Sequence, residues 1–324
     1  MHPIIDQMKG RRVIVFGDVV LDHYVWGEVE RISPEAPVPV VRVQHENDMP
    51  GAAANVAMNL AALDARAIMI GVIGDDPDGQ RLRDLLQQQN VDCTYLLTAP
   101  GTRTTRKTRI IARNQHVVRV DWDTILPPDV VRKSGAINAL ERALPACDAV
   151  IIQDYHKGLI LPTLFDHVKC ISQPVIVDPN RYHNITYRGM IATPNLEEAR
   201  ILSGVACSSS DALAYLNEIA RGFFARHEVE HLLITLGDKG IALCERDGTV
   251  RRRPAAKTHS VYDVSGAGDT VCAVLAAAVA TGAPLWHACQ LANIAGAIVV
   301  GKMGTATTSR AELQELLDTV GLVD

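Results

Sequence analysis

Short, continuous hydrophobic runs alternate along the chain with longer segments of helical periodicity. Residues 13–17, 68–74 and 175–178 are apolar through nearly their whole length, which is typical of strands buried on both faces of a parallel sheet. Further strands are expected at 149–152 and 232–235, and helices at 52–63, 78–89, 162–171, 195–203, 211–226, 269–281, 285–300 and 309–319. Repeated strand–helix units predict an α/β fold whose doubly wound, mostly parallel sheet has helices on both faces.

Two segments break this alternation and predict a second, smaller sheet. Residues 38–43 are rich in β-formers but contain Pro39, which suits an exposed edge strand. The block 102–120 contains two strand-like runs with no helix between them. We expect approximately residues 24–45 and 102–120 to form a β-sheet lid that projects from one domain covering residues 1–324.

Composition narrows the class of protein. The chain has 324 residues, of which 48% are hydrophobic, enough for one large α/β domain with a small appendage. Its net charge of −5 gives no overall basic footprint for nucleic acid. No apolar run approaches the roughly twenty residues that span a bilayer, and the N-terminus has no apolar signal core. Seven dispersed cysteines without a Cys-x-x-Cys pair fit reduced thiols. The sequence therefore predicts a soluble cytoplasmic protein with neither a nucleic-acid nor a membrane partner.

The most informative stretch is 263–270, Asp-Val-Ser-Gly-Ala-Gly-Asp-Thr, which opens an apolar helix. Gly266 and Gly268, on either side of Ala267, allow a sharp turn that leaves amide groups free at the positive end of the helix, and such a place binds anions. A carboxylate at its rim would repel a resting phosphate. Asp269 instead suits a base that takes a proton from a hydroxyl group as that oxygen attacks a phosphoryl group. The alternative is that Asp269 only caps the helix.

Polar residues follow several of the predicted strands. Asp18, Gln153, Asp154, Asp178 and Thr235 all stand at carboxyl ends. Ligands of doubly wound sheets bind beyond that edge, so we expect these side chains to converge.

Two further motifs have both a structural and a functional interpretation. Asn195 and Glu198 have a spacing close to that of a capping box, but Glu198 could also order water on a Mg²⁺ ion that bridges phosphates. The stretch Thr235-x-Gly237-x-Lys239 is an ordinary hairpin turn. If it borders the phosphate site, Lys239 and the turn amides could neutralise the phosphates of a nucleotide.

A cluster of cations and a polar helix residue point to a ligand near the lid. In a strand over 103–109, Arg103, Lys107 and Arg109 share one face, which indicates an anionic ligand such as a substrate phosphate, or else a charged edge that discourages strand pairing. Asn55 lies in an apolar helix that we expect to open from a Pro-Gly turn within 47–55. It suits recognition of a hydroxyl group, although a surface asparagine is equally consistent.

Several nucleotide and hydrolase motifs are absent. The sequence has no Gly-x-x-x-x-Gly-Lys-[Ser/Thr], no Gly-x-Gly-x-x-Gly after the first strand and no Gly-x-Ser-x-Gly. These absences count against a P-loop enzyme, a dinucleotide-binding fold and a serine hydrolase, respectively.

Four motifs occur in an order that resembles the ribokinase-like (PfkB) sugar kinases along essentially the whole chain. They are Gly51-Ala-Ala-Ala-Asn55, Asn195-Leu-Glu-Glu198, Thr235-Leu-Gly237 and the stretch 263–270. The resemblance implies ATP-dependent phosphorylation of a sugar hydroxyl, with Asp269 as the base and the amides of 266–268 as the anion hole. It also implies a β-sheet lid over the sugar that is often shared across a homodimer.

Within the family, the strings at 19–22, 31–40, 105–109 and 154–158 are similar to the branch that acts on D-glycero-β-D-manno-heptose 7-phosphate. That similarity implies transfer of the ATP γ-phosphate to the anomeric C1 hydroxyl, giving heptose 1,7-bisphosphate for lipopolysaccharide-core and ADP-heptose synthesis. Bifunctional relatives carry an additional nucleotidyltransferase domain, and we expect none in this chain.

The resemblance and the residue patterns together imply a set of site residues. The sugar phosphate is expected to contact Asp18, Asp22, Asn47, Gly51, Ala52, Asn55, Arg103, Lys107, Arg109, Gln153, Asp154, Lys157, Asp178 and Arg181. ATP is expected to contact Asn195, Thr235, Gly237, Lys239, Gly266, Gly268, Asn293, Ala297, Gly301, Met303 and Gly304. Mg²⁺ is expected through water on Glu198, and a monovalent cation such as K⁺ near Asp263.

One departure and two alternatives remain. The family usually has two adjacent glycines where this chain has Gly51-Ala52, and the added methyl group is expected to strain the backbone or crowd the sugar. The first alternative is a kinase of another sugar or nucleoside, for which the cations at 103, 107 and 109 would have no use. The second is a protein that only binds sugar or nucleotide as a regulator, which the intact Asp269 and glycine loop argue against.

Overall fold

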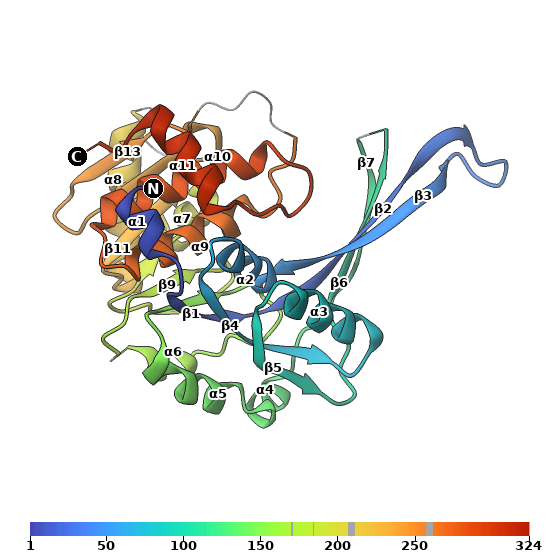
Figure 1. The fold of residues 1–324 in the computed structure, drawn as a ribbon, viewed down its shortest axis with the longest axis horizontal. Coiled ribbons are helices and arrows are strands. Elements are labelled where there is room, and N and C mark those ends of the chain that lie inside the picture. Colours follow the sequence, from blue (N-terminus) through green and yellow to red (C-terminus); the bar gives the residue numbers. More distant parts are fainter. Residues whose placement is uncertain (114, 170, 184, 207–210, 257–261, 324) are drawn as a thin grey trace.

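The main body is built on a nine-stranded sheet with the order β13-β12-β11-β10-β9-β8-β1-β4-β5 (Figure 1). The computed structural model describes residues 1–113, 115–169, 171–183, 185–206, 211–256 and 262–323. The strands are β1 (Arg12–Gly17), β4 (Arg66–Gly74), β5 (Asp92–Ala99), β8 (Ala149–Gln153), β9 (Val175–Asp178), β10 (Ile191–Ala192), β11 (His231–Thr235), β12 (Ile241–Cys244) and β13 (Val250–Arg253). The pairs β11–β12 and β12–β13 are antiparallel and the other pairs are parallel. The predicted α/β class is confirmed.

Helices cover both faces of this sheet. One face carries α1 (Pro3–Gln7), α2 (Ala53–Ala62), α3 (Pro77–Gln88), α9 (Ala267–Val279), α10 (Leu285–Val300) and α11 (Arg310–Val320). The other carries α4 (Pro128–Ser134), α5 (Ala136–Ala143), α6 (Leu164–Val168), α7 (Leu196–Ser203) and α8 (Ala212–His227). Each face of the sheet packs against its helices in a hydrophobic core of its own. Val13 and Val15 of β1 lie in one core and Ile14 and Phe16 lie in the other, because side chains alternate across a strand.

A second sheet projects from this body, as expected (Figure 1). Its order is β3-β2-β6-β7, with strands β2 (Val19–Ile32), β3 (Pro39–Ala52), β6 (Arg106–Ala112) and β7 (Gln115–Trp122). β2 begins two residues after β1 ends, so the lid continues directly from an interior strand of the main sheet. β7 is exposed along its whole length.

Three local expectations were wrong. The helix expected at 162–171 is only the short α6. Residues 47–51 do not form a Pro-Gly turn; they continue β3, where Pro50 and Gly51 pair with Leu21 and Val20.

The strand expected from residue 103 begins instead at Arg106. Thr104, which precedes this strand, is held by Asp76 instead of by a neighbouring strand. Its hydroxyl donates to the Asp76 carboxylate at 2.7 Å, and its amide donates to the same carboxylate at 2.8 Å. Arg103 is therefore not on a strand face with Lys107 and Arg109.

The described residues bear on the expectations about membrane-spanning segments and cysteines. None of the helices in that part of the chain is both long and apolar enough to cross a membrane. Cysteines 93, 147, 244, 272 and 289 are free and buried, whereas Cys170 and Cys207 lie outside the described residues.

Candidate active site

The helix α9 begins at the carboxyl edge of the main sheet and places Asp269 in its first turn. Gly266 occupies the N-cap position with φ 76°, and α9 has no side-chain cap. The amide of Thr270 donates to the Gly266 carbonyl at 3.0 Å, so the amides of Gly268 and Asp269 precede the first intrahelical bond and lie at the positive end of the helix. Gly266, and not Asp269, therefore occupies the cap position, and the anion site expected at these amides stays a prediction.

Asp269 is held by three donors from two segments, α2 and the end of β8 with the loop after it. Its side chain is 3% exposed. The Oδ2 atom accepts a hydrogen bond from Nδ2 of Asn55 at 2.9 Å, while Oδ1 accepts bonds from Nε2 of Gln153 at 3.1 Å and from the Tyr155 hydroxyl at 2.7 Å. Burial raises the pKa of Asp269 to about 6, although the bonds from Asn55 and Tyr155 lower it. A carboxylate with a pKa near neutrality, fixed beside free helix amides, can serve as a general base.

Two further acids lie along this edge: Asp178 is near Asp269, and Glu198 is near Asp178. Gln153 links two of the acids, because its Nε2 also donates to Asp178 at 2.6 Å. Burial, followed by repulsion from Glu198 and Asp269, raises the pKa of Asp178 well above its usual range. The Oε1 atom of Gln153 is buried without a partner in the described part of the chain. Such an arrangement favours a cationic or hydrogen-bonding ligand at this edge.

Asp18 is placed differently from the other acids. Its carboxylate is 2% exposed and accepts bonds from the backbone amides of Tyr155, Lys157 and Leu159 at 2.9–3.0 Å. These contacts favour holding a loop over holding a sugar.

The lid contributes an ion pair and a lysine. Arg109 pairs with the buried Asp22 and lies 5.3 Å above the ring of Tyr24. The Nζ atom of Lys107 lies 5.8 Å above the ring of Tyr155, and burial lowers the pKa of Lys107. Since the charge of Arg109 is already neutralised by Asp22, Lys107 is the better placed of the two to meet an anionic ligand.

Four other residues expected to contact the sugar phosphate each contact a different partner. Lys157 pairs with Asp123 at 2.8 Å. Arg181 is exposed and lies 5.0 Å over the Tyr182 ring. Asp154 is buried and bonds His183 at 2.5 Å. Asn47 is exposed on β3 and accepts a bond from Trp26 at 2.8 Å.

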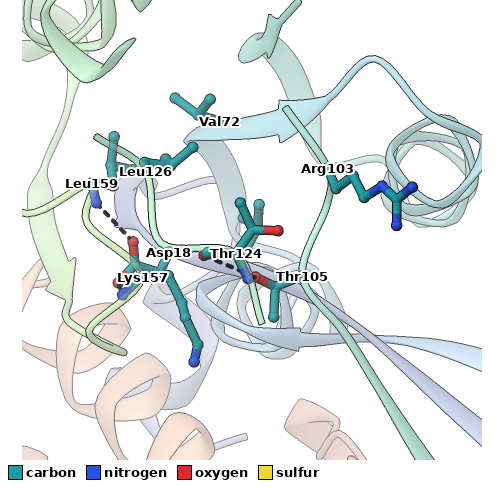
Figure 2. Close-up of a pocket in the computed structure, with 9 residues that line it drawn as sticks. Asp18, Val72, Arg103, Thr105, Thr124, Leu126, Lys157 and Leu159 are labelled. Carbon is teal, nitrogen blue, oxygen red and sulfur yellow. Dashed lines mark hydrogen bonds between the residues drawn. The ribbon is translucent and has the colours of Figure 1, made fainter. Parts of the chain in front are cut away.

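Figure 2 shows a small cavity between the lid and the loop after β8. Asp18, Thr105, Thr124 and Lys157 are among the residues that line it, and Arg103 extends away from Asp18. Its volume is about 10 Å³, room for roughly one water molecule. This cavity is too small for a sugar phosphate, and its lining includes Arg103 but not Lys107.

Gly51 and Ala52 form the joint between β3 and α2. A Cβ atom on Gly51 would collide with the carboxylate of Asp22, which explains why only glycine fits there. Ala52 has φ 55° and ψ −132°, a region that is costly for a residue with a side chain. The backbone strain expected from the missing second glycine is present.

Replacing Ala52 by glycine is expected to stabilise the protein by about 1 kcal/mol, because relief of the strained conformation exceeds the entropy cost of glycine. The midpoint of thermal unfolding should rise by about 2 °C. Ala53→Gly is the matched control. Ala53 is the first residue of α2, and glycine there should destabilise by about 0.5–1 kcal/mol. A fall in midpoint for both variants would contradict the strain at Ala52.

The expected nucleotide residues extend along the neighbouring strand ends. Asn195 and Glu198 form a complete capping box with bonds of 2.9 and 3.0 Å, and Asn195 bridges to Thr235. Residues 237–239 form a short 3₁₀ turn, η2 (Gly237–Lys239), with Lys239 exposed.

A second wall of the expected nucleotide site comes from α10 and the loop after it. Asn293 and Ala297 are buried in α10, and Nδ2 of Asn293 already donates to the carbonyl of Pro254 at 2.8 Å. Gly301 follows α10 at its C-cap, Met303 is 43% exposed, and the Gly304 amide donates to Asp263 at 3.2 Å. Asp263 thereby joins the loop before α9 to the loop after α10.

Tyr155 was missed by the sequence analysis as a site residue. It lies two residues beyond β8, in a segment whose neighbours Asp154 and Lys157 were chosen for their charge. A tyrosine in a loop carries no signal of its own. Only the packing of this loop against α9 brings its hydroxyl to Asp269.

The fold and this site define a class of protein. A buried carboxylate beside the amide end of a helix, at the carboxyl edge of a doubly wound sheet and next to a projecting lid, is the arrangement of a kinase for a small hydroxyl compound. The sequence pattern of the pfkB family carbohydrate kinases matches residues 11–312. The chain belongs to that family.

Curated relatives cover most of this chain. It is 40% identical over 310 residues to a protein of Wolinella succinogenes named bifunctional protein HldE, covering 94% of this chain and 64% of that protein. A protein of the same name from Gluconacetobacter diazotrophicus is 42% identical over 307 residues, with coverages of 93% and 62%. This chain therefore spans a little under two thirds of the length of these relatives.

Solved structures support the fold. Phosphofructokinase-2 from Escherichia coli matches with a TM-score of 0.77 at 17% identity, covering 97% of this chain and all of the other. A ribokinase from Arabidopsis thaliana, solved in complex with ribose and ATP, matches with a TM-score of 0.70 at 20% identity and coverages of 95% and 99%. At these identities the likeness establishes the ribokinase-like fold and nothing finer.

Proposed function

We propose that this chain transfers the γ-phosphate of ATP to the anomeric C1 hydroxyl of D-glycero-β-D-manno-heptose 7-phosphate. The product would be heptose 1,7-bisphosphate, an intermediate of ADP-heptose and lipopolysaccharide-core synthesis. The observation that carries the proposal is the buried Asp269 at the amide end of α9 with Lys107 nearby. Membership of the pfkB family and the 40% identity to proteins named HldE support the choice of sugar.

In this proposal Asp269 is the base. ATP supplies the phosphoryl group and ADP leaves. Asp269 takes the proton of the C1 hydroxyl as the sugar oxygen forms its bond to phosphorus and the bond to the ADP oxygen breaks. The amides at the start of α9 stabilise the negative charge of the transferred group. Asn55 and Gln153 keep the carboxylate oriented.

The sugar phosphate would lie between the lid and the strand ends. Lys107 would bind its 7-phosphate, and Lys157 lies close enough to lower the pKa of Lys107 by repulsion. Asn55, Gly51 and the pair of Asp22 with Arg109 border the sugar ring in the proposed complex. Asn47, Ala52, Asp154, Asp178 and Arg181 complete the proposed surroundings.

ATP would follow the neighbouring strand ends. Its phosphates would lie beside η2 and the loop before Asp269, and its adenine against Ala297, Met303 and Gly304. Within the described residues there is no cluster of three or more side chains able to hold a metal ion. We therefore place Mg²⁺ on the nucleotide phosphates, reached through water by Glu198, whose pKa is raised by burial. K⁺ is proposed near Asp263; E. coli phosphofructokinase-2 has been solved in complex with potassium.

We further propose that two chains pair through their lids and that the enzyme works in the cytoplasm, where ATP is available. The lid sheet exposes Val117, Val118, Val120 and Trp122 on β7, and an exposed apolar face of this kind favours an interface. Sedimentation of the purified protein should give the mass of a dimer. A monomer at micromolar concentration would contradict this part of the proposal.

The proposal is tested by ADP release with Mg-ATP and heptose 7-phosphate, beside fructose 6-phosphate and ribose. Turnover is expected with the heptose phosphate. Lys107→Glu should raise the KM for it roughly 10- to 100-fold, the effect of losing a charge-assisted contact. Lys133→Glu, on the exposed face of α4, is the matched charge reversal and should change nothing.

Other outcomes distinguish the alternatives. Turnover with another sugar only would support the kinase activity and contradict heptose 7-phosphate as the substrate. ATP binding without turnover of any sugar would favour a regulator that binds nucleotide. An unchanged KM in Lys107→Glu would remove Lys107 from the phosphate site.

A further inference from the structure

The loop after β8 borders the proposed site. Tyr155, in this loop, donates its hydroxyl hydrogen to Oδ1 of Asp269 at 2.7 Å. The ring of Tyr155 lies beneath Nζ of Lys107, 5.8 Å away. One side chain thus touches both the proposed base and the proposed phosphate-binding lysine, and no step described above uses it.

Asp18 holds the same loop through hydrogen bonds to three of its backbone amides. Oδ2 accepts hydrogen bonds from the amides of Tyr155 at 3.0 Å and Lys157 at 2.9 Å. Oδ1 accepts a hydrogen bond from the amide of Leu159 at 3.0 Å (Figure 2). Burial of this carboxylate raises its pKa to about 6 in spite of the three bonds. Burying a carboxylate costs stability. The cost at Asp18 suggests that the position of this loop matters for function.

We propose that Tyr155 is a positioning residue for Asp269, and that Asp18 fixes the loop so that the Tyr155 hydroxyl stays on Oδ1. The proposal rests on the function proposed above, with Asp269 as the base. A carboxylate has about four acceptor sites. Oδ1 receives two bonds and Oδ2 one, so a free acceptor site on Oδ2 is what remains for the hydroxyl of the sugar.

The alternative is that the tyrosine only fills space. Its hydroxyl group, however, is directed to a carboxylate that already has two amide donors, and it is the nearest of the three donors at 2.7 Å. A group that only packed would need no such contact. The distinction can be measured because phenylalanine keeps the ring and removes the donor.

Besides Tyr155, several titratable groups lie near Asp269 and would act on its titration. They are Asp22 on β2, Lys107 on β6, Asp178 at the end of β9 and the thiol of Cys272 on α9. These four groups remain when the Tyr155 hydroxyl is removed. The pKa of Asp269 should then rise, because the ionised form loses one donor.

The first experiment compares Tyr155→Phe with Tyr187→Phe. Tyr187 is a buried tyrosine whose hydroxyl has no partner in the described part of the structure, so its variant controls for loss of a buried hydroxyl. Tyr155→Phe should lower kcat roughly 10-fold, leave the KM for ATP unchanged and move the acid limb of the pH profile upward by about one unit. Tyr187→Phe should change neither kcat nor the limb.

The second experiment tests the link to Asp18 with a double-mutant cycle. Asp18→Asn replaces one acceptor oxygen by a donor and should release the loop. If Asp18 acts through Tyr155, adding Tyr155→Phe to Asp18→Asn should lower kcat less than about twofold further. Independent, multiplying effects would overturn the link, and circular dichroism verifies that each variant is folded.

A measurement without substrate separates this inference from the proposed function. The carboxyl carbon of Asp269 is followed by NMR in protein labelled with ¹³C-aspartate, and Asp269→Asn assigns the signal. Its titration midpoint should rise in Tyr155→Phe and stay in place in Tyr187→Phe. Unchanged midpoints would overturn the inference even in an active enzyme. Failure of the wild type to phosphorylate any sugar would instead overturn the function and leave this titration to decide the role of Tyr155.

Discussion

Asp269→Asn is expected to lower kcat by roughly 10²- to 10⁴-fold, the usual contribution of a general base. Asparagine keeps the size of the side chain and one carbonyl oxygen, which can still accept the bonds from Gln153 and Tyr155, while the bond from Asn55 to the other oxygen is lost. It cannot take a proton from the sugar. Because binding does not require that proton transfer, the KM for ATP should change little.

The pH dependence of the same pair of proteins gives a second measurement. Burial raises the pKa of Asp269 to about 6, and a base acts only when it is ionised. The rate of the wild type should therefore fall as the pH drops through about 6, and this acid limb should be absent from the residual activity of Asp269→Asn. Asp18 has a raised pKa of about 6 as well, and a limb caused by Asp18 would persist in the variant.

A surface variant controls for the chemical change itself. Asp318→Asn lies on the exposed side of α11 and should match the wild type in rate and pH profile. Residual activity above one tenth of the wild-type rate in Asp269→Asn would count against Asp269 as the base. A large loss accompanied by a lower unfolding midpoint would instead indicate damage to the packing around α9.

Gly266→Ala is the second substitution for which a large effect is expected. Gly266 has φ 76°, and a Cβ atom there would lie 2.5 Å from Nδ2 of Asn55. That amide nitrogen is the donor to Oδ2 of Asp269. The methyl group would therefore displace both the turn amides and a partner of the base, and a displacement of about 1 Å in such a site lowers kcat/KM roughly 100-fold.

Gly282→Ala separates the backbone cost from the contact with Asn55. Gly282 has φ 79° but no atom within 4 Å of the position of a Cβ atom. Both variants bear the cost of about 1–2 kcal/mol for a side chain in the left-handed region, so both should unfold at lower temperature. Only Gly266→Ala should lose activity. Equal activities in the two variants would contradict the anion-binding role of this turn.

Much of the fold was predictable from local sequence. The buried strands β1, β4, β8 and β9 and the helices α9, α10 and α11 were expected near their observed positions, because continuous apolar runs and helical periodicity reflect burial directly. β2 was recognised only in part, since its first half alternates acids and rings that also occur in loops. The short strand β13 was not predicted, because four residues carry too little pattern.

The candidate site divides in the same way. Asp269, Gly266, Asn55 and Gln153 were chosen from sequence. The structure joins Asp269, Asn55 and Gln153 by hydrogen bonds and packs Asn55 against Gly266. The expected row of cations did not form. Arg109 is neutralised by Asp22, and Arg103 lies outside the strand, because ion pairing and strand register depend on what the rest of the chain places opposite each residue.

The sequence by itself determined the α/β class, the family motifs and the residue types that phosphoryl transfer needs, since these depend on short-range pattern. Only the tertiary structure decided which polar groups meet. Tyr155 reaches Asp269 across 114 positions of sequence, and Asp18 reaches the loop that carries Tyr155 across 137. Such contacts arise because parallel strands bring distant segments to one edge of the sheet, and no local pattern records which donor will face which acceptor there.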